Sequence, residues 1–342
     1  MGFLILHEFP TSQIELAWRE CLARVECPAH YNAPEYFLVP HWAGRRPFAV
    51  LALDGSTVTG VLTGLHEPAQ VMCGLASRPQ ICVDTNANLH AVTEDLARGL
   101  FLEAGTAGLV SVFTWQGLPL PAFERLGFRR KQLEGNVVLD LTQGTDALFK
   151  QFAKDRRRNV RFAEKNGVEV CMATTDADIA ECYEVYRAWR HTERKKLTGE
   201  KTDLETFAKA ARLAHRRMFV ARVAGKPVAV NIFRLFPGGL FESASNYSRD
   251  EFLHLKPNEL LQWRGIQWAC SQGLRRHSLG GAHSFLRRFG GAVVPVVRYR
   301  FDRTWLRRHD LRESVLNMSR QTAQRMPALG RTVRRVLGRK TY

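Results

Sequence analysis

The chain has 342 residues, of which 45% are hydrophobic and 24% are charged, and its formal net charge at pH 7 is +17. This composition excludes wholesale disorder, and at about 150 residues per domain the length predicts two domains. So large a positive charge indicates an anionic partner: nucleic acid, an acidic carrier protein, a phosphorylated substrate or an anionic membrane. The alternative is that the arginines reflect genome composition alone.

The seven cysteines form no CxxC pair, and the eleven histidines form no HExxH or HxH spacing. We therefore expect neither a disulfide framework nor a metal site, and we expect the cysteines to be reduced core residues. The first ten residues, MGFLILHEFP, lack a basic leader and a cleavage site, so they predict a β-strand rather than a signal peptide. No run of about 20 apolar residues occurs. These features together predict a cytoplasmic protein.

Local patterns predict a series of elements in the first 130 residues. A helix over 11–25 begins at a Thr11 or Ser12 cap, and a hairpin that starts at Phe48 turns at Asp54-Gly55. A strand around Ile81, a helix over 89–105, a strand over 108–115 and the short motif FERLGF (123–128) follow in that order.

The same order returns about 170 residues later, a spacing typical of a duplicated domain. Three helical segments come first, over 146–165, 175–197 and 202–218. A hairpin then starts at Phe219 and turns at Gly225-Lys226-Pro227. The remaining elements are a strand around Phe241, a helix over 257–273 that starts at Pro257, a strand over 274–281 and the motif FLRRFG (285–290).

The repeated order predicts an α/β (α+β) architecture with two copies of one domain, over 1–140 and 141–302. Residues 303–342 form a basic tail with eleven Lys or Arg residues and two acids, Asp310 and Glu313. A rough helical stripe predicts that this tail is partly helical. Three arrangements of the tail are open: it packs on the domains, contacts an anionic surface, or is mobile. The stripe consists of Trp305, Leu311, Val315, Leu316, Leu329, Val333 and Val336.

The segment KDRRRNVRFAEK (154–165) concentrates positive charge on one predicted helix. Arg157, Arg161 and Lys165 are spaced i, i+4, i+8 and form a basic stripe, which either binds phosphates or is a solvated face. Arg156 instead falls on the apolar face, together with Phe152 and Val160. A guanidinium there needs a partner, so it points either to an acidic residue or to a ligand.

This segment also carries a family resemblance. Residues 157–168, RRNVRFAEKNGV, resemble the RxNIRKAxKxGV pattern of FemAB-type enzymes. The Pro257 helix followed by GLRRHSLGG (273–281) is similar to that family's helix and G-x-x-x-x-D-L-G-G, and FLRRFGG (285–291) is similar to F-K-x-x-F-G-G. The resemblance spans most of 1–302. It implies a tandem duplication of the GNAT acyltransferase fold, with mixed sheets flanked by helices, that transfers an acyl or aminoacyl group to an amine.

Two positions depart from the family pattern. Leu286 stands where the family has the lysine of F-K-x-x-F-G, so Arg287 must substitute for it or the activity is altered. Ser278 stands where the family has the aspartate of D-L-G-G, which removes one acidic hydrogen-bond acceptor. These departures support an alternative of another class, a non-catalytic protein that binds RNA or an anionic membrane on the same fold.

The identity of the donor depends on the loop before each domain's main helix. Acetyl-CoA enzymes of this fold hold the pyrophosphate on a glycine-rich loop at a helix N-terminus. Here those loops read VDTNANLH and NYSRDEFLHLKPNE, without such glycines. We therefore expect a larger co-substrate, aminoacyl-tRNA, because phosphate contacts dominate such binding. The alternatives are an acyl carrier protein and acyl-CoA held on a different loop, and no tightly bound cofactor is expected.

The resemblance places the site where the strands of the second copy splay apart. We expect Tyr247 to donate a proton or orient the acceptor and Arg287 to bind the developing oxyanion. Lys256, Asn258, Arg249 and the basic stripe are expected to contact the donor. The expected acceptor-binding residues are Arg156, Arg190, Arg194 and Arg288. The alternatives are a half-buried core tyrosine for Tyr247 and ordinary helix C-terminal cations for Arg190 and Arg194.

The predicted function is transfer of an aminoacyl or acyl group from an activated donor to an amine, possible acceptors being cell-wall or polysaccharide precursors. The expected partners are tRNA or an acyl carrier protein, the amine acceptor and, through the basic tail, the inner face of an anionic membrane.

Overall fold

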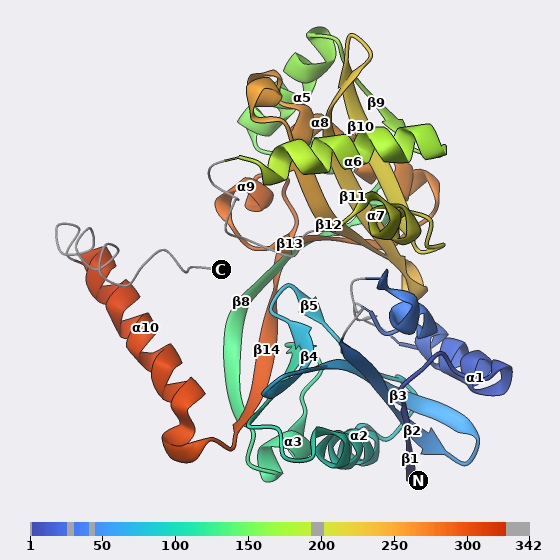
Figure 1. Ribbon diagram of the computed structural model, residues 1–342, viewed down its shortest axis with the longest axis vertical. Coiled ribbons are helices and arrows are strands. Elements are labelled where there is room, and N and C mark those ends of the chain that lie inside the picture. The colour runs from blue at the N-terminus through green and yellow to red at the C-terminus, as the bar shows by residue number, and fades with distance from the viewer. Residues whose placement is uncertain (1, 26–30, 41–44, 193–201, 326–342) are drawn as a thin grey trace.

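The computed structural model describes residues 2–25, 31–40, 45–192 and 202–325, which form one mixed sheet with helices on both faces (Figure 1). The strand order is β1-β2-β3-β4-β7-β14-β8-β13-β12-β11-β10-β9, with β5 paired to β4 and β6 paired to β3. Two pairs among the described strands are parallel, β4 with β7 and β12 with β13. Each half of the chain contributes one of them, as a duplicated fold requires.

The first half confirms the predicted order of elements. The turn of its hairpin lies at Gly55, whose φ of +60° suits glycine. Helices α1 and α2 cover opposite faces of the sheet, and Trp18 on α1 and Leu96 on α2 are fully buried. The elements are β1 (Gly2–Leu6), α1 (Ser12–Ala23), η1 (Pro34–Leu38), β2 (Arg46–Asp54), β3 (Thr57–Glu67), β4 (Gln70–Leu75), β5 (Arg78–Pro79), β6 (Ile81–Val83), α2 (Leu89–Ala104), β7 (Leu109–Trp115), α3 (Pro121–Arg125) and β8 (Arg129–Asp140).

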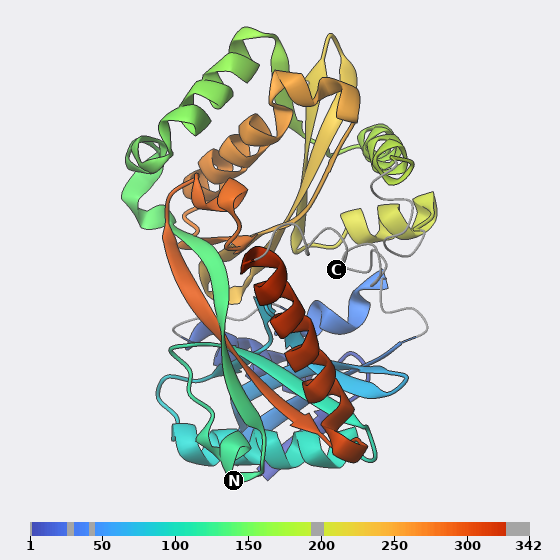
Figure 2. The ribbon, with the colours of Figure 1, turned by 90° about the vertical axis from the view of Figure 1, so that its left-hand side faces the viewer.

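The second half repeats this layout with more helices. Figure 2 shows α5 and α8 on one side of its strands and α6 and α7 on the other. The elements are η3 (Leu141–Gln143), α4 (Gly144–Gln151), α5 (Lys154–Lys165), β9 (Val168–Met172), α6 (Asp176–Arg190), α7 (Leu204–Ala211), β10 (Arg216–Val223), β11 (Lys226–Phe236), η4 (Pro237–Gly239), β12 (Leu240–Ser248), η5 (Asp250–Leu255), α8 (Pro257–Ser271), β13 (Arg276–Gly281), α9 (Ser284–Arg287) and β14 (Ala292–Asp302).

Three predicted helices have different limits in the structure. The helix expected over 175–197 ends at Arg190 as α6, and its residues 193–197 lie outside the described residues. The helix expected over 146–165 is two helices, because Phe152 has an extended ψ of 141° and separates α4 from α5. The helix expected over 202–218 ends at Ala211, because residues from Arg216 onward pair with β11. Pairing with a neighbouring strand therefore overrides the local helical pattern of residues 212–218.

Strands β8 and β14 link the two halves. β8 pairs with β13 of the second half, whereas β14 pairs with β7 of the first half, and β8 and β14 also pair with each other. Each half is thus completed by the last strand of the other, which the sequence did not predict. The boundaries at residues 140 and 302 remain predictions, and they coincide with the ends of these two strands.

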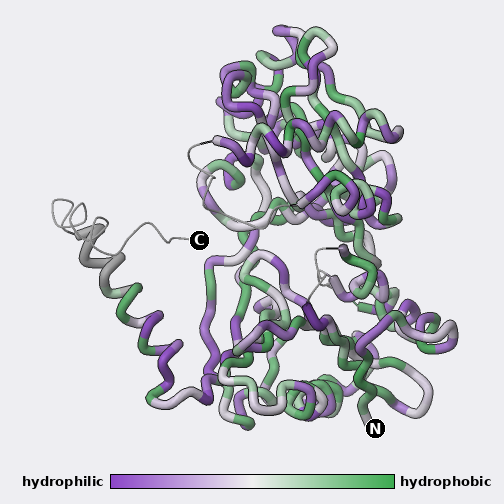
Figure 3. The backbone as a smooth tube through the Cα atoms, viewed as in Figure 1, coloured by the Kyte–Doolittle hydropathy of each residue, from purple (hydrophilic) through white to green (hydrophobic). Residues whose placement is uncertain are grey.

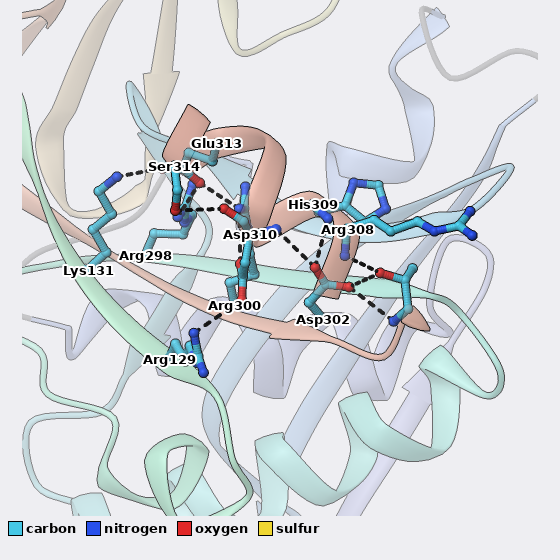
Figure 4. A network of polar contacts seen from close by, with 11 residues as sticks. Arg129, Lys131, Arg298, Arg300, Asp302, Arg308, His309, Asp310, Glu313 and Ser314 are labelled. Atoms are coloured by element: carbon cyan, nitrogen blue, oxygen red, sulfur yellow. Dashed lines mark hydrogen bonds and ion pairs between the residues drawn. The ribbon is translucent and has the colours of Figure 1, made fainter. Parts of the chain in front are cut away.

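The chain continues through η6 (Trp305–Arg307) into α10 (Arg308–Arg325), which projects away from the sheet (Figures 1 and 2). The helix is anchored at its start (Figure 4). Asp302 accepts hydrogen bonds from the backbone N–H groups of His309 and Asp310, and Glu313 accepts from Lys131, Arg298 and Arg300. Hydrophobic and hydrophilic residues alternate along α10 (Figure 3). Leu329, Val333 and Val336 lie outside the described residues.

Among the described residues, every helix is too short or too polar to cross a bilayer.

Candidate active site

The predicted splay between two strands of the second half is confirmed. β12 and β13 pair only at Leu240–Arg276, Phe241–His277 and Glu242–Ser278, although β12 continues to Ser248. The divergence leaves a cavity of about 390 Å³, here called the splay pocket. It is lined by Ser243, Ala244, Ser245, Asn246, Asn258, Gln262, Leu279, His283, Phe285 and Leu286.

The start of α8 forms one end of the splay pocket. Ser248 Oγ donates to Asn258 Oδ1 at 2.7 Å, which fixes the side-chain amide and leaves its Nδ2 group to donate. Asn258, predicted to contact the donor, therefore does line the pocket. Lys256 precedes the helix in a left-handed conformation with a φ of +60°, and Arg249 Nε donates to the carbonyl of Pro227 at 3.1 Å. Both cations flank the pocket's end without lining it.

The segment between β12 and α8 does not form an open phosphate-binding loop with free backbone N–H groups. It folds as the 3-10 helix η5, in which the N–H groups of Phe252 and Lys256 bond to Arg249 and Leu253 carbonyls. Pro257, at the first position of α8, has no N–H group to offer. Several amides that a pyrophosphate would need are therefore already engaged or missing.

Tyr247 lies on the other side of β12. It lines a second cavity of about 280 Å³, here called the aromatic pocket, whose ring-bearing residues are Tyr186, Trp189, Phe207 and Tyr247. Its ring is 5.0 Å from that of Tyr186 and 4.9 Å from that of Trp189. Burial raises the pKa of the Tyr247 phenol, which keeps it protonated at neutral pH. Ser245 lines both cavities, so they meet at this residue.

Arg287 is placed differently from the expectation. It lies on α9 but donates to the carbonyl of Ala282 and to Glu134 on β8, and it does not line the splay pocket. Arg288 pairs with Asp155 at the surface. The residue that reaches the pocket from this motif is Leu286, so the pocket wall is apolar where the family carries a lysine. The assignment of Arg287 to the oxyanion, and of Arg288 to the acceptor, is corrected accordingly.

Arg156 pairs with an acidic residue, which is the first of its two predicted alternatives. Its Nη1 donates to Glu259 Oε1 at 2.5 Å, both residues are buried, and its guanidinium lies 4.0 Å from the centre of the Phe285 ring. Asn159 donates to the same Glu259 oxygen at 3.0 Å. The expected contact of Arg156 with the acceptor is therefore corrected: this side chain ties α5 to α8 and α9.

The three residues of the basic stripe on α5 have different surroundings. Arg157 donates to the carbonyls of Lys150 and Phe152, so it closes the break between α4 and α5. Arg161 and Lys165 are exposed. Arg190 lines the aromatic pocket and donates to Tyr186 at 3.3 Å, whereas Arg194 lies outside the described residues.

Several residues that the sequence did not single out lie in the two pockets. His283 precedes α9 and is the titratable side chain among those that line the splay pocket. Arg216 and Arg234 line the aromatic pocket although they belong to strands β10 and β11. A basic residue within an apolar strand is a signal for Arg216 and Arg234, but His283 has no distinguishing pattern around it.

Comparison with known proteins identifies the fold. Residues 150–289 match the family model described as an acetyltransferase (GNAT) domain, and a search of curated proteins finds no significant match. FemX has 13% identity, covers 87% of this chain and 97% of its own, and has a TM-score of 0.65. The C-terminal domain (DUF2156) of a putative lysylphosphatidylglycerol synthetase from Agrobacterium fabrum has 12% identity, coverage of 91% and 96%, and a TM-score of 0.60.

A third similar structure is a tandem GNAT protein from the clavulanic acid biosynthesis pathway, which has 12% identity, covers 89% of this chain and 99% of its own, and has a TM-score of 0.57. Residues 150–289 thus match a GNAT acetyltransferase domain, and the chain has the tandem GNAT fold that the sequence predicted. The protein is an acyltransferase, which acts on an acyl donor and an amine acceptor.

Proposed function

We propose that this acyltransferase transfers an aminoacyl group from aminoacyl-tRNA to an amine, in the cytoplasm. The observation that carries the choice of donor is η5, the 3-10 helix that replaces an open phosphate-binding loop and uses the N–H groups of Phe252 and Lys256 internally. Acyl-CoA and an acyl carrier protein are the alternative donors. The names of two neighbours of this fold, FemX and lysylphosphatidylglycerol synthetase, also favour aminoacyl transfer.

The position of α5 supports a long, anionic donor. α5 packs alongside α8, with Arg156 and Asn159 against Glu259 and with Glu164 against Arg264, so the two helices run in the same direction. Arg157 therefore lies near the pocket end of α8, and Lys165 lies ~12 Å further along at 1.5 Å per residue. Exposed Arg161 and Lys165 lead away from the site, as contacts to a polynucleotide backbone require.

The splay pocket holds the groups that aminolysis needs. The amine nitrogen attacks the ester carbonyl, the new C–N bond forms, the ester C–O bond breaks, and one proton passes from the amine to the leaving oxygen. His283 is placed to accept that proton and return it. Asn258 Nδ2 and the Ser245 hydroxyl are the candidate donors to the carbonyl oxygen. Tyr247, protonated and on the acceptor side, would orient the amine.

The test is donor binding, because it requires no knowledge of the acceptor. Purified protein is titrated with charged tRNA, acetyl-CoA and an acyl carrier protein at two salt concentrations. We expect salt-sensitive tRNA binding that weakens when Arg161→Gln and Lys165→Gln are combined, with the salt slope reduced by about 1 for each lost phosphate contact. Lys209→Gln on α7, combined with Arg212→Gln directly after it, removes the same charge as a control. Saturable acetyl-CoA binding without tRNA binding would contradict the proposal.

The C-terminal segment supports a further part of the proposal, contact with an anionic membrane. Trp305 and Leu306 are 73% and 60% exposed, and Leu311, Val315 and Met318 on α10 are more than half exposed. Apolar side chains beside basic residues suit the surface of an anionic bilayer. We expect sedimentation with phosphatidylglycerol vesicles but not with phosphatidylcholine vesicles, and loss of it in Trp305→Ser with Leu306→Ser. The non-catalytic alternative would retain tRNA or vesicle binding without any transfer.

A further inference from the structure

The aromatic pocket contains two buried arginines with unused donors. Arg216 on β10 and Arg234 on β11 are each 5% exposed, and both line the pocket. Nε and Nη2 of Arg216 and Nε of Arg234 have no hydrogen-bond partner among the described residues. Buried polar groups in native proteins are almost always hydrogen-bonded, so three such nitrogens on two residues that line one cavity indicate a ligand that accepts hydrogen bonds.

The charge around the pocket has the same implication. Glu242, on β12, is the buried acid nearby, and it already accepts from Arg78 and from Arg234 Nη1. Arg216 makes no ion pair with any described residue, and none of the described residues that line the pocket is acidic. Three guanidinium groups therefore lie near one carboxylate, which pairs with those of Arg78 and Arg234 and leaves that of Arg216 without an ionic partner. Burying the surplus positive charge is costly unless an anion joins it.

Arg216 remains charged in this environment. Burial, and then the like charge of Arg234, lower the pKa of Arg216 to about 10, so the guanidinium is still protonated at neutral pH. A guanidinium offers paired N–H donors that match the two oxygens of a carboxylate or phosphate. The rings of Tyr186, Trp189, Phe207 and Tyr247 form an apolar wall beside these donors.

We infer that the aromatic pocket binds an oxyanion group, a carboxylate or a phosphate, carried by the amine acceptor. This inference rests on the proposed function, because it treats the splay pocket as the place of transfer. The two pockets meet at Ser245, so an acceptor held by Arg216 and Arg234 would present its amine toward the splay pocket. The volume of about 280 Å³ accommodates the oxyanion and a small adjoining group, with the rest of the acceptor outside.

The test measures binding by calorimetry, with no acyl donor present, using phenyl phosphate, benzoate and the neutral probe benzyl alcohol. We expect at least one anionic probe to bind and benzyl alcohol to bind far more weakly. Arg216→Met should lower the affinity for the anionic probe on the order of 30-fold or more. Stronger binding of phenyl phosphate would identify a phosphate, and stronger binding of benzoate a carboxylate. Equal binding of all three probes would overturn the inference.

Arg217→Met is the matched control, since it removes the same charge from the next residue of β10. Arg217 lies over Trp268 and does not line the pocket. Equal losses in Arg216→Met and Arg217→Met would mean general attraction by positive charge and would overturn the inference. Because Arg216 is an unpaired buried charge, Arg216→Met should melt at the same temperature as the wild type or higher when no probe is present. Should that variant fail to fold, Arg216→Lys keeps the charge and should weaken binding less severely.

The pocket inference and the proposed function can fail independently of each other, and two results distinguish them. Oxyanion binding that requires Arg216, in a protein that transfers nothing from any donor, would support the pocket and contradict the acyl-transfer proposal. Transfer to amines that carry a carboxylate or phosphate, at an undiminished rate in Arg216→Met, would support acyl transfer and contradict the pocket.

Discussion

Arg78, in the first half of the chain, donates from Nε to Glu242 Oε1 at 2.5 Å, and its Nη2 donates to the carbonyl of Ala244 at 2.9 Å. Both acceptors belong to β12 at the point where it separates from β13. The short strand β5, which carries Arg78, interrupts the run from β4 to β6 and reaches across to the second half. The first half therefore supports the geometry of the splay pocket from outside it.

Glu242→Gln should be strongly destabilising. Glu242 is 1% exposed, and its loss leaves Arg78 and Arg234 without their carboxylate partner. Removing one partner of a buried ion pair typically costs about 3–5 kcal/mol of unfolding free energy. Urea unfolding monitored by fluorescence measures the change. Glu164→Gln, in the exposed pair with Arg264, is the control and should cost less than ~1 kcal/mol. Similar losses in the two variants would show that Glu242 has no special role.

The parts of the fold that local chemistry determines could be predicted from sequence. The hairpin turns at Gly55 and Gly225, both with positive φ, and the Pro257 start of α8 follow from the conformations that glycine and proline favour. The exchange of β8 and β14 could not be predicted in this way. RRKQLEGNVVLD has a weak alternation, and its partner strand is about 160 residues away, so only the assembled sheet determines the pairing.

The candidate site was predictable in its location and in part of its residues, since Asn258 lines the splay pocket and Tyr247 and Arg190 line the aromatic pocket. Arg156, Asn159 and Phe285 stand out in the sequence, and the structure uses them to join α5, α8 and α9. His283 reaches the splay pocket through tertiary contacts that no local pattern indicates, whereas Arg216 could have been noticed as a basic residue at an apolar strand. A charged residue in a motif can stabilise the scaffold around a site as readily as it contacts a substrate, so the motif alone does not distinguish these roles.

Removing one member of the Arg156–Glu259 pair should destabilise the protein more than replacing both members with apolar residues. Arg156→Met leaves the Glu259 carboxylate buried with only Asn159 as a described hydrogen-bond partner, and should lower the free energy of unfolding by about 3–5 kcal/mol. Adding Glu259→Leu removes the isolated charge and should restore most of that loss. A double-mutant cycle in urea measures both effects. If the double variant were as unstable as the sum of the single variants, the pair would not be coupled.

The attachment of α10 should depend on pH. Partial burial alone would raise the pKa of Glu313, but hydrogen bonds from Lys131 and Arg298 and the charge of Arg300 lower it from 4.5 to about 2. Because the folded pKa is the lower one, this contribution is fully present above pH 4.5 and is lost as the pH falls toward 2. Hydrogen exchange of the amides of 308–318 should therefore speed up in this window before that of β12.

Glu313→Gln should reproduce this release at neutral pH, because it removes the negative charge that Lys131, Arg298 and Arg300 share. Ser314→Ala is the control, since Ser314 bonds only within its own helix, to the carbonyl of Asp310. Unchanged exchange of 308–318 in Glu313→Gln would show that other contacts, such as the Asp302 carboxylate, hold the helix.

His283→Gln should slow transfer without preventing donor binding. A positioned general base contributes about 10²–10⁴-fold to the rate, so kcat should fall within that range while the KM for the donor changes little. Single-turnover transfer from the donor identified by titration measures the effect. His254→Gln is the matched control, because His254 is an exposed residue of η5 that bonds to the carbonyl of Glu251 and does not line the splay pocket. A kcat that is unchanged in His283→Gln, or reduced equally in both variants, would exclude His283 as the base and leave substrate groups or Tyr247 to handle the proton.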